Sequence, residues 1–367
     1  MAYSFVRSGE SELEFSTSEL TGALGDSVTV LPLLVALAAT TSVSLPHVLV
    51  GFGIFQIVWG LYYRMPLSIE PMKALVGLAI VGSLSYPELA AAGLLAGAVL
   101  LAIGSFGLVG HLQRLVGEPV VRGVQFAVAL LLLEAAVGLS VGNLSVAVAG
   151  LAVVGLFALV GYRSVSVLVV LAVGGVVAVA TAGIPSPETP AVVPFPAGTP
   201  TLSTAALEGT VAQLGMTLGN AAIATALLCG DLYDRDVSAD SLSKSMGVTC
   251  LAAVPIGGIP MCHGSGGLAG KHAFGARTGG ANVLLGVGYL ALALVAAGAV
   301  LAAFPMAVLG ALLVVVAAEL ARAALEPVSG VRSLAVVVGV GAVGVAVNVG
   351  LAFALGAVAF WVLSREA

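Results

Sequence analysis

Charged residues are scarce in this sequence, and their scarcity decides the class of protein. Only 8% of the 367 residues are Asp, Glu, Lys or Arg, whereas 60% are hydrophobic. A soluble domain carries roughly 25% charged residues, so this chain cannot cover a surface that faces water. We therefore expect an integral membrane protein. The net charge of -5 leaves no basic patch for nucleic acid, and we expect no nucleic-acid partner.

Cysteine is also rare, which argues against disulfides and metal sites. Cys229, Cys250 and Cys262 are odd in number and have no C-x-x-C spacing. Cys262 stands next to His263, but two adjacent side chains without further ligands make a poor zinc site. The sequence also lacks an evident nucleophile–base pair. We therefore expect no metal, no cofactor and no enzymatic activity.

Long apolar runs fill most of the chain. A helix that spans a bilayer needs about 20 apolar residues. On that scale we predict about fourteen spans, at residues 22–43, 47–63, 66–84, 88–110, 119–140, 144–162, 164–183, 203–230, 244–257, 258–273, 281–303, 305–322, 331–347 and 348–364. The prediction is an all-α polytopic membrane protein that has the lipid bilayer as a partner.

The predicted spans divide the chain into two halves. Residues 1–21 form a polar, acidic cytoplasmic tail without the basic region that would mark a signal peptide. The first set of spans covers residues 22–183, a Pro-rich external linker follows at 184–202, and the second set covers 203–364. Because each half holds an odd number of spans, the second half enters the membrane from the opposite side. We therefore predict a seven-plus-seven inverted repeat.

The basic residues test this topology. With the N-terminus in the cytoplasm, nearly every Lys and Arg falls at a cytoplasmic end, and the outer connections near 83–88, 140–143 and 184–201 have none. The positive-inside rule demands this distribution. We expect a multi-pass protein of the cell membrane with both termini in the cytoplasm. Lys271 is assigned to a cytoplasmic end, whereas Lys73 falls inside the third span.

The third and tenth spans are interrupted by polar residues at membrane depth. The interruptions are Pro66–Ala74 and Pro260–Gly267. Pro71 removes a backbone donor and disfavours helix in the residue before it. We expect extended chain over 67–70 and 255–260, each followed by a short helix. Broken spans at matching positions are typical of the binding site of a transporter.

The two short helices of an inverted repeat point in opposite directions, so their N-termini can face each other. Helix N-termini expose unpaired N–H groups and about half a positive charge each, which favours an anion. Gly264, Gly266 and Gly267 would let the backbone approach a ligand, Ser265 adds a hydroxyl and Lys73 adds a full charge. The pattern favours a compact oxyanion. The alternative is a pair of simple kinks with Lys73 snorkelling to the interface.

Polar residues in other spans complete the candidate site. Asp26 and Thr29 lie in the first span, and Asn220 lies in the eighth. Each of these two spans opens one half of the chain, so the predicted repeat relates them to each other. Asp26 either lines the site or neutralises Lys73. Intramembrane ionisable residues are functional by default, and Glu70, Asp26 and His263 are the candidates for carrying a proton. The predicted substrate-binding residues are Asp26, Thr29, Glu70, Met72, Lys73, Ala74, Asn220, Cys262, His263, Gly264, Ser265, Gly266 and Gly267.

These motifs resemble the molybdate transporter family of the sulfate permease (SulP) superfamily. The resemblance rests on Gly22–Thr29, Pro71–Ala74 and Gly219–Thr225 and, most specifically, on Pro260–Gly279. One departure is Glu70, because the family usually has Gln before Pro-Met-Lys. A carboxylate beside an anion site repels the ligand unless it is protonated or neutralised, which opens a proton-coupling role.

The resemblance implies a uracil-permease/SulP-like fold with two domains. Spans 1–4 and 8–11 would form a core domain and spans 5–7 and 12–14 a gate domain, with an elevator-like movement between them. It also implies uptake of molybdate first and sulfate second, the absence of a cytoplasmic STAS domain, and a homodimer.

The predicted function is a secondary active transporter that imports a tetrahedral oxyanion, molybdate first, together with protons. No ATP-binding motif is present, so a gradient or a partner must supply the driving force. Sulfate and tungstate stay open as substrates because they share the geometry and charge of molybdate. A nucleobase or organic anion transporter is a further alternative, although a nucleobase would need paired amide or carboxylate groups. An anion channel is another alternative function. Flux that saturates and is coupled to a gradient would exclude it.

Overall fold

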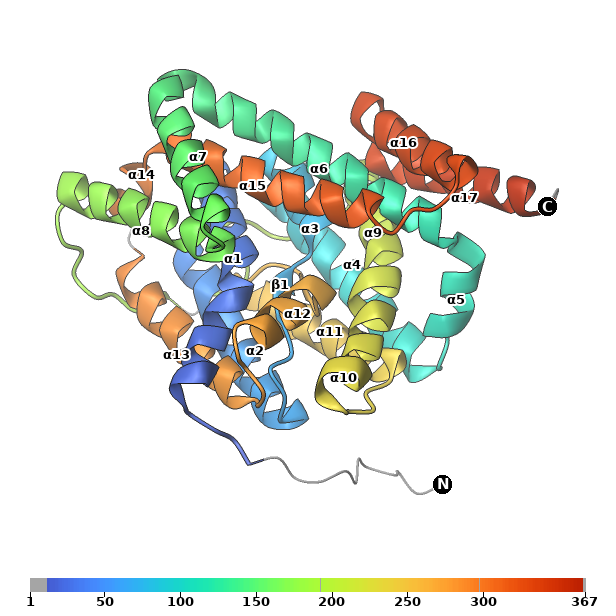
Figure 1. Ribbon diagram of the computed structural model, residues 1–367, viewed down its shortest axis with the longest axis horizontal. Coiled ribbons are helices and arrows are strands. Elements are labelled where there is room, and N and C mark those ends of the chain that lie inside the picture. Colours follow the sequence, from blue (N-terminus) through green and yellow to red (C-terminus); the bar gives the residue numbers. More distant parts are fainter. Residues whose placement is uncertain (1–11, 192, 297, 366–367) are drawn as a thin grey trace.

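The fold is almost entirely helical. The computed structural model describes residues 12–191, 193–296 and 298–365 (Figure 1). The first half contains α1 (Thr17–Thr40), α2 (Leu45–Tyr63), β1 (Glu70–Pro71), α3 (Lys73–Ile80), α4 (Tyr86–Ser105), α5 (Val109–Val116), α6 (Glu118–Ser140), the 3-10 turn η1 (Val141–Asn143), α7 (Leu144–Leu159) and α8 (Arg163–Ala182). The second half contains α9 (Thr204–Met216), the π-helical turn η2 (Thr217–Ala224), α10 (Thr225–Tyr233), α11 (Ala239–Ala253), the 3-10 turn η3 (Val254–Ile256), β2 (Met261–Cys262), α12 (Ser265–Ala273), α13 (Gly280–Val295), α14 (Gly298–Ala302), α15 (Met306–Leu325), α16 (Val331–Ala346) and α17 (Val349–Arg365).

Long apolar helices cross the body of the protein. Within the described residues, seven helical stretches are long and apolar enough to cross a membrane, and one of them, Glu118–Leu159, runs through α6 and α7. α13, α16 and most of α17 are shorter but also apolar. The predicted all-α polytopic class, with short extended stretches in the two broken segments, is confirmed. The count of fourteen spans stays a prediction.

Capping side chains explain why two helices begin earlier than predicted. α1 starts at Thr17 rather than at residue 22, because the Ser16 hydroxyl accepts a hydrogen bond from the Glu19 N–H. α11 starts at Ala239 rather than at residue 244, because Ser238 caps its first turn. Part of the predicted tail, residues 1–11, lies outside the described residues.

The helices form two packing groups. α6, α7, α8, α15, α16 and α17 pack on one another and occupy the upper and left parts of the view in Figure 1. α1–α4 and α9–α13 pack together below them. We call these the gate group and the core group, because they contain the spans assigned to the predicted gate and core domains. A movement of one group relative to the other stays a prediction.

The packing partners of the two halves correspond to each other. α2 packs against α13, and α11 packs against α4. α1 packs against α12 and α13, whereas α9 packs against α3 and α4. In the predicted repeat α1 corresponds to α9, α2 to α11, α3 to α12 and α4 to α13. When each helix is replaced by its counterpart, the first contact of each pair becomes the second. This exchange supports the inverted repeat, which stays a prediction.

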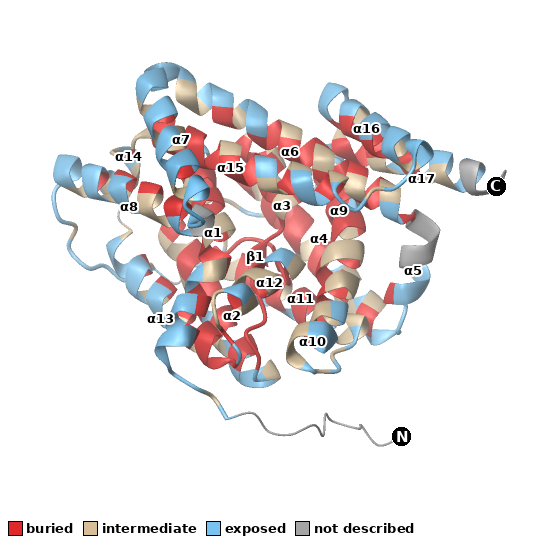
Figure 2. Ribbon diagram, in the orientation of Figure 1, coloured by how far each residue is buried: buried red, intermediate tan, exposed pale blue. Residues whose placement is uncertain are grey.

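Buried residues lie at the centre of the protein and exposed apolar residues on its outside (Figure 2). The chain of β1, β2 and α3 is largely buried, whereas α7, α8 and α17 expose Leu156, Val176 and Val358. Large apolar side chains on an outer face suit contact with lipid rather than with water. The fold therefore places both broken segments deep inside a lipid-facing bundle.

Candidate functional site

The two broken segments meet in a short antiparallel ladder. β1 pairs with β2 so that Glu70 lies opposite Cys262. The N–H of Met72 extends the ladder by donating to the carbonyl of Pro260 at 2.9 Å. α3 follows β1 and α12 follows β2 within a few residues. Because the strands are antiparallel, the two short helices leave the ladder in opposite directions.

The second extended stretch lies later than the sequence predicts. Residues 255–260 were expected to be extended, but Val254–Ile256 form a 3-10 turn. Gly257 ends this turn with a φ of 85°, a conformation that favours glycine. The paired extended residues are Met261–Cys262, and His263 and Gly264 separate them from the start of α12 at Ser265.

A cavity of about 280 Å³ lies beside the two helix starts. Its core-side wall comes from α1, α3, η2 and α12, and its gate-side wall comes from α6 and α15. The lining residues are Gly25, Val28, Thr29, Lys73, Asn220, Ser265, Gly266, Gly267, Gly270 and Phe274 on the core side and Gln125, Val316, Glu319, Leu320 and Ala323 on the gate side. The cavity thus lies between the two packing groups.

Lys73 is the basic residue of this cavity, and Glu70 holds its ammonium group. The two form an ion pair in which the Lys73 side chain is 15% exposed and that of Glu70 only 1%. Glu70 Oε1 also accepts a hydrogen bond from the N–H of Gly267 at 2.9 Å. The positive end of the α12 dipole stabilises a carboxylate there. The N–H groups of Ser265 and Gly266, in the same first turn, have no acceptor within the helix and remain available to a ligand.

Gly267 is required at this contact because a side chain would collide with the groups around it. A Cβ on Gly267 would overlap Ser68 Oγ and the carboxylates of Asp26 and Glu70, whereas a Cβ on Gly266 would meet open space. We expect Gly267→Ala to lower the free energy of unfolding by about 1–3 kcal/mol through overpacking. Gly266→Ala should leave it unchanged or slightly higher. Thermal unfolding of both purified variants in detergent measures the difference, and equal midpoints would contradict the contact.

A second ion pair lies behind the cavity, between Asp26 on α1 and Lys271 on α12. Its N–O distance is 3.3 Å, and both side chains are fully buried. Ser68 Oγ donates to Asp26 at 2.8 Å, and Lys271 donates to Asn282 Oδ1 at 2.8 Å. The alternative in which Asp26 neutralises Lys73 is therefore wrong. Lys271 is buried inside the bundle, and its assignment to a cytoplasmic end stays a prediction.

The depth of Lys271 follows from the length of the short helix. Lys271 is six residues (271 − 265) beyond the start of α12, which corresponds to about 9 Å at 1.5 Å per residue. Half of a membrane core is about 15 Å thick. A helix that starts near the middle of the membrane therefore keeps Lys271 inside it.

His263 lies among scaffold residues rather than in the cavity. Its Nε2 is 2.7 Å from Ser245 Oγ, and its Nδ1 is 3.1 Å from the carbonyl oxygen of Ser68. The side chain is buried and packs edge-on against Trp59 and Tyr63. His263 therefore fixes the second broken segment against the first and against α11.

The N-terminus of α3 is partly capped by the protein itself. Gln213 on α9 accepts hydrogen bonds through its Oε1 from the N–H groups of Ala74 at 2.9 Å and Leu75 at 3.4 Å. The sequence assigned this position to a ligand and missed Gln213. Of the predicted residues, the cavity gathers Thr29, Lys73, Asn220, Ser265, Gly266 and Gly267, while Asp26, Glu70, Met72, Ala74, Cys262, His263 and Gly264 lie outside its lining.

Asn220 joins the core-side wall through an irregular stretch of helix. It lies on the π-helical turn η2, and π-turns inside α-helices are frequent at functional sites. Its Oδ1 accepts a hydrogen bond from Ser265 Oγ at 2.6 Å. This contact ties the eighth predicted span to the start of α12.

The gate-side wall contributes two polar residues that the sequence analysis missed, Gln125 and Glu319. Each is a polar residue in a mostly apolar helix, which is a general signal of function at membrane depth. The signal alone could not tell which face of α6 or α15 turns towards the core group.

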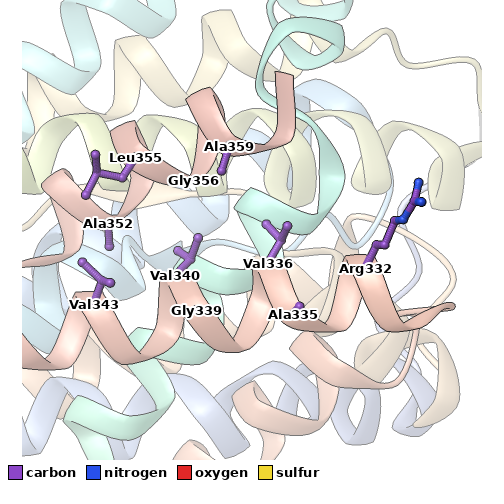
Figure 3. Close-up of a pocket in the computed structure, with 10 residues that line it drawn as sticks. All are labelled: Arg332, Ala335, Val336, Gly339, Val340, Val343, Ala352, Leu355, Gly356 and Ala359. Carbon is purple, nitrogen blue, oxygen red and sulfur yellow. The ribbon is translucent and has the colours of Figure 1, made fainter. Parts of the chain in front are cut away.

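An apolar groove on the outside of the protein offers no comparable site. It lies between α16 and α17, has a volume of about 480 Å³ and is lined by small and aliphatic residues, with Arg332 at one end (Figure 3). A polar ligand that leaves water needs several hydrogen-bonding partners in return. The central cavity, with a cation and polar side chains on both walls, is therefore the candidate functional site.

Sequence comparison finds similar proteins over both halves of the chain. A family model described as molybdate transporter of MFS superfamily matches residues 18–132 and 205–320. The *Arabidopsis thaliana* proteins named Molybdate transporter 1 and Molybdate transporter 2 are 31% and 28% identical to this chain. Their alignments each cover 84% of this chain, and 79% and 78% of the respective relative. A *Chlamydomonas reinhardtii* protein named Molybdate transporter 1 is 27% identical over 86% of the chain and 85% of its own length.

Comparison with solved structures finds the same fold in anion transporters. The transmembrane domain of a cyanobacterial bicarbonate transporter, BicA, superposes with a TM-score of 0.67 at 16% identity, covering 95% of this chain and 98% of that one. The murine Slc26a9 anion transporter, in the inward-facing state, superposes with a TM-score of 0.73 at 14% identity, covering 97% of this chain and 69% of that one. At these identities the likeness shows the fold alone.

Proposed function

Because the chain belongs to the molybdate transporter family, we propose that it is a secondary active transporter that imports molybdate across the cell membrane. As a member of that family it is a multi-pass membrane transporter and not an enzyme. One observation carries the proposal, namely that Lys73 and the start of α12 line one cavity between the two packing groups. The proposal places both termini in the cytoplasm, as the distribution of basic residues favours.

The cavity suits a small tetrahedral oxyanion. Its volume of about 280 Å³ lies below the roughly 300–1,000 Å³ of pockets that hold drug-sized ligands. A dianion there would meet the Lys73 ammonium and the N–H groups of Ser265 and Gly266, while the Ser265 hydroxyl donates to Asn220. These donors would replace the hydration shell that the anion gives up on binding. Sulfate and tungstate, with the same shape and charge, are the competing substrates.

Glu70 would couple anion binding to a proton. Without an anion it neutralises Lys73, so a dianion that approaches Lys73 competes with a carboxylate. Protonation of Glu70 removes this competition and frees the ammonium group for the ligand. Asp26 suits the role less well because it is bound to Lys271. His263 suits it less well because its ring nitrogens lie against Ser245 and the carbonyl of Ser68 rather than beside Lys73.

Replacement of Glu70 by Gln should make molybdate uptake less dependent on pH. Glutamine keeps the size of the side chain and can still accept the N–H of Gly267, but it has no carboxyl group to titrate. We expect wild-type uptake to fall as the pH rises and uptake by the variant to change much less. Labelled molybdate uptake into proteoliposomes over a pH series measures this, with Glu326→Gln as a control at an exposed position. The same pH profile for Glu70→Gln and wild type would rule out the coupling role.

Competition experiments test the substrate. We expect unlabelled molybdate and tungstate to suppress labelled molybdate uptake strongly, sulfate to suppress it more weakly, and uracil to have no effect. Uptake should saturate and should follow an imposed proton gradient. Suppression by uracil would favour a nucleobase transporter, and flux that neither saturates nor responds to the gradient would favour a channel.

A further inference from the structure

A buried hydroxyl joins the two ion pairs of the core group. Ser68 Oγ lies 2.8 Å from Asp26 Oδ1 and 3.2 Å from Glu70 Oε1. Ser68 and Asp26 are 0% exposed, and Glu70 is 1% exposed. A Cβ on Gly267 would overlap all three of these oxygen atoms, so they converge on one point beside the first turn of α12. The proposed function leaves this hydroxyl without a role.

The hydroxyl of Ser68 cannot satisfy two ionised carboxylates at once. A serine has one O–H hydrogen and two lone pairs. When both carboxylates are ionised, the hydroxyl donates to one of them, and the other contact joins two oxygen atoms without a hydrogen. The shorter distance assigns the hydrogen to Asp26. A proton on either carboxylate gives both contacts a hydrogen, because the new carboxyl O–H donates to Ser68 while Ser68 donates to the remaining carboxylate. The geometry therefore fits a pair of carboxylates that holds a single proton.

The balance of charge indicates when this proton is taken up. Without an anion, Glu70 pairs with Lys73. Asp26 pairs with Lys271, so two carboxylates face two cations. A dianion that binds Lys73 leaves only one of these cations for both carboxylates. Because an uncompensated charge is costly in a buried site, uptake of one proton by the pair is favourable at that moment.

Other titratable side chains also face the pair of carboxylates, and they are Lys73 on α3, Lys271 on α12, Cys262 on β2, His263 after β2 and Tyr289 on α13. The two lysines are the cations already bound to the pair. Hydrogen bonds hold the His263 ring on both sides and the Tyr289 hydroxyl at Ser27. The Cys262 thiol donates to the carbonyl of Pro71. Among the described residues around Ser68, Glu70 and Asp26 are the carboxylates that compete for its hydrogen.

We propose that Ser68 holds the coupled proton between Glu70 and Asp26 while the anion is bound. Glu70 releases Lys73 to the dianion and takes one proton from the solution, and its new O–H donates to Ser68 Oγ. Transfer onward breaks the O–H bonds of Glu70 and Ser68 and forms new O–H bonds on Ser68 and Asp26, so one proton moves and no charge is lost. Ser68 acts as a positioning residue, and one proton accompanies each dianion at this site. The inference rests on the proposed function, because it assumes that molybdate binds at Lys73.

Molybdate binding to the purified wild type over a pH series tests the count of protons. Where one proton is taken up with the anion, the affinity should fall about ten-fold for each unit that the pH rises. Proton uptake measured directly in weakly buffered detergent solution should then equal one proton for each molybdate bound. Uptake of two protons would overturn the sharing of one proton, because each carboxylate would then take its own.

Ser68→Ala tests the bridge itself. The variant loses one hydrogen bond when the pair is ionised and two when the pair holds a proton. The difference is one hydrogen bond, which corresponds to about ten-fold in the equilibrium for protonation. The curve of affinity against pH should therefore move about one unit to lower pH with the same slope. Ser243→Ala removes another fully buried hydroxyl, which donates to the carbonyl of Leu100 at 2.8 Å, and should leave the curve in place.

The outcomes separate this inference from the proposed function. A Ser68→Ala curve at the wild-type position, or weakened by the same factor at every pH, would overturn the bridge while leaving molybdate transport and coupling at Glu70 intact. Glu70→Gln should bind molybdate without proton uptake, and wild-type uptake in this variant would likewise overturn the shared proton. Wild type that binds molybdate without taking up a proton would overturn both the coupling role of Glu70 and the bridge. Wild type that does not bind molybdate would overturn the proposed function, and this inference with it.

Discussion

Replacement of Lys73 by Ala is expected to abolish molybdate binding at micromolar concentrations. The variant loses the cation of the cavity, and it leaves the Glu70 carboxylate without its partner beside the bound anion. Truncation of one member of a buried charge pair costs about 2–5 kcal/mol in binding, and each 1.4 kcal/mol is ten-fold in affinity. We therefore expect a loss of about 30-fold to several thousand-fold. Titration of the purified variant with molybdate measures it.

A double variant separates the two causes of this loss. Lys73→Ala with Glu70→Gln removes the cation without leaving an unpaired carboxylate, so it should bind molybdate more tightly than Lys73→Ala alone. Lys244→Ala, at an exposed position on α11, removes a lysine charge away from the cavity and should bind like wild type. Wild-type affinity in Lys73→Ala would show that the anion binds elsewhere.

Much of the core-side wall could be predicted because its signals are local. Pro71 and Pro260 interrupt apolar runs, and the effect of proline on its own and the preceding residue does not depend on the rest of the fold. The glycines after His263 likewise mark the start of a helix that a ligand can approach. The sequence predicts a short helix after residue 260, and the structure places its start at Ser265. The membrane class followed from composition alone.

The rest of the site depends on contacts between residues that are far apart in the sequence. Nothing local to Asp26 indicates that its partner is Lys271 rather than Lys73, because both lysines lie on short helices next to the ladder. The N–H groups of α3 were predicted to be free, yet Gln213 reaches them from α9. Glu319 could be placed in the cavity only when the packing of α15 was known. A single sequence gives the chemistry of such residues but not their neighbours.

The buried pair of Asp26 and Lys271 should have the largest effect on stability. Lys271→Ala would leave Asp26 charged and fully buried without its cation. Breaking a buried pair on one side costs about 3–5 kcal/mol, which is a large fraction of the roughly 5–15 kcal/mol that stabilises a typical folded protein. We expect a strongly lowered midpoint of thermal unfolding in detergent, or failure to purify a folded protein.

A double-mutant cycle distinguishes loss of the ion pair from loss of packing at Lys271. Asp26→Asn with Lys271→Met replaces both charges by neutral side chains of similar size, which is often neutral for stability. The double variant should therefore unfold at a higher temperature than either single variant, because neither charge is left alone. Arg322→Ala breaks an exposed pair, so it should cost less than about 1 kcal/mol. A double variant that is less stable than both single variants would contradict this expectation. It would show that the polar network that includes Asn282 and Ser68 requires both charges.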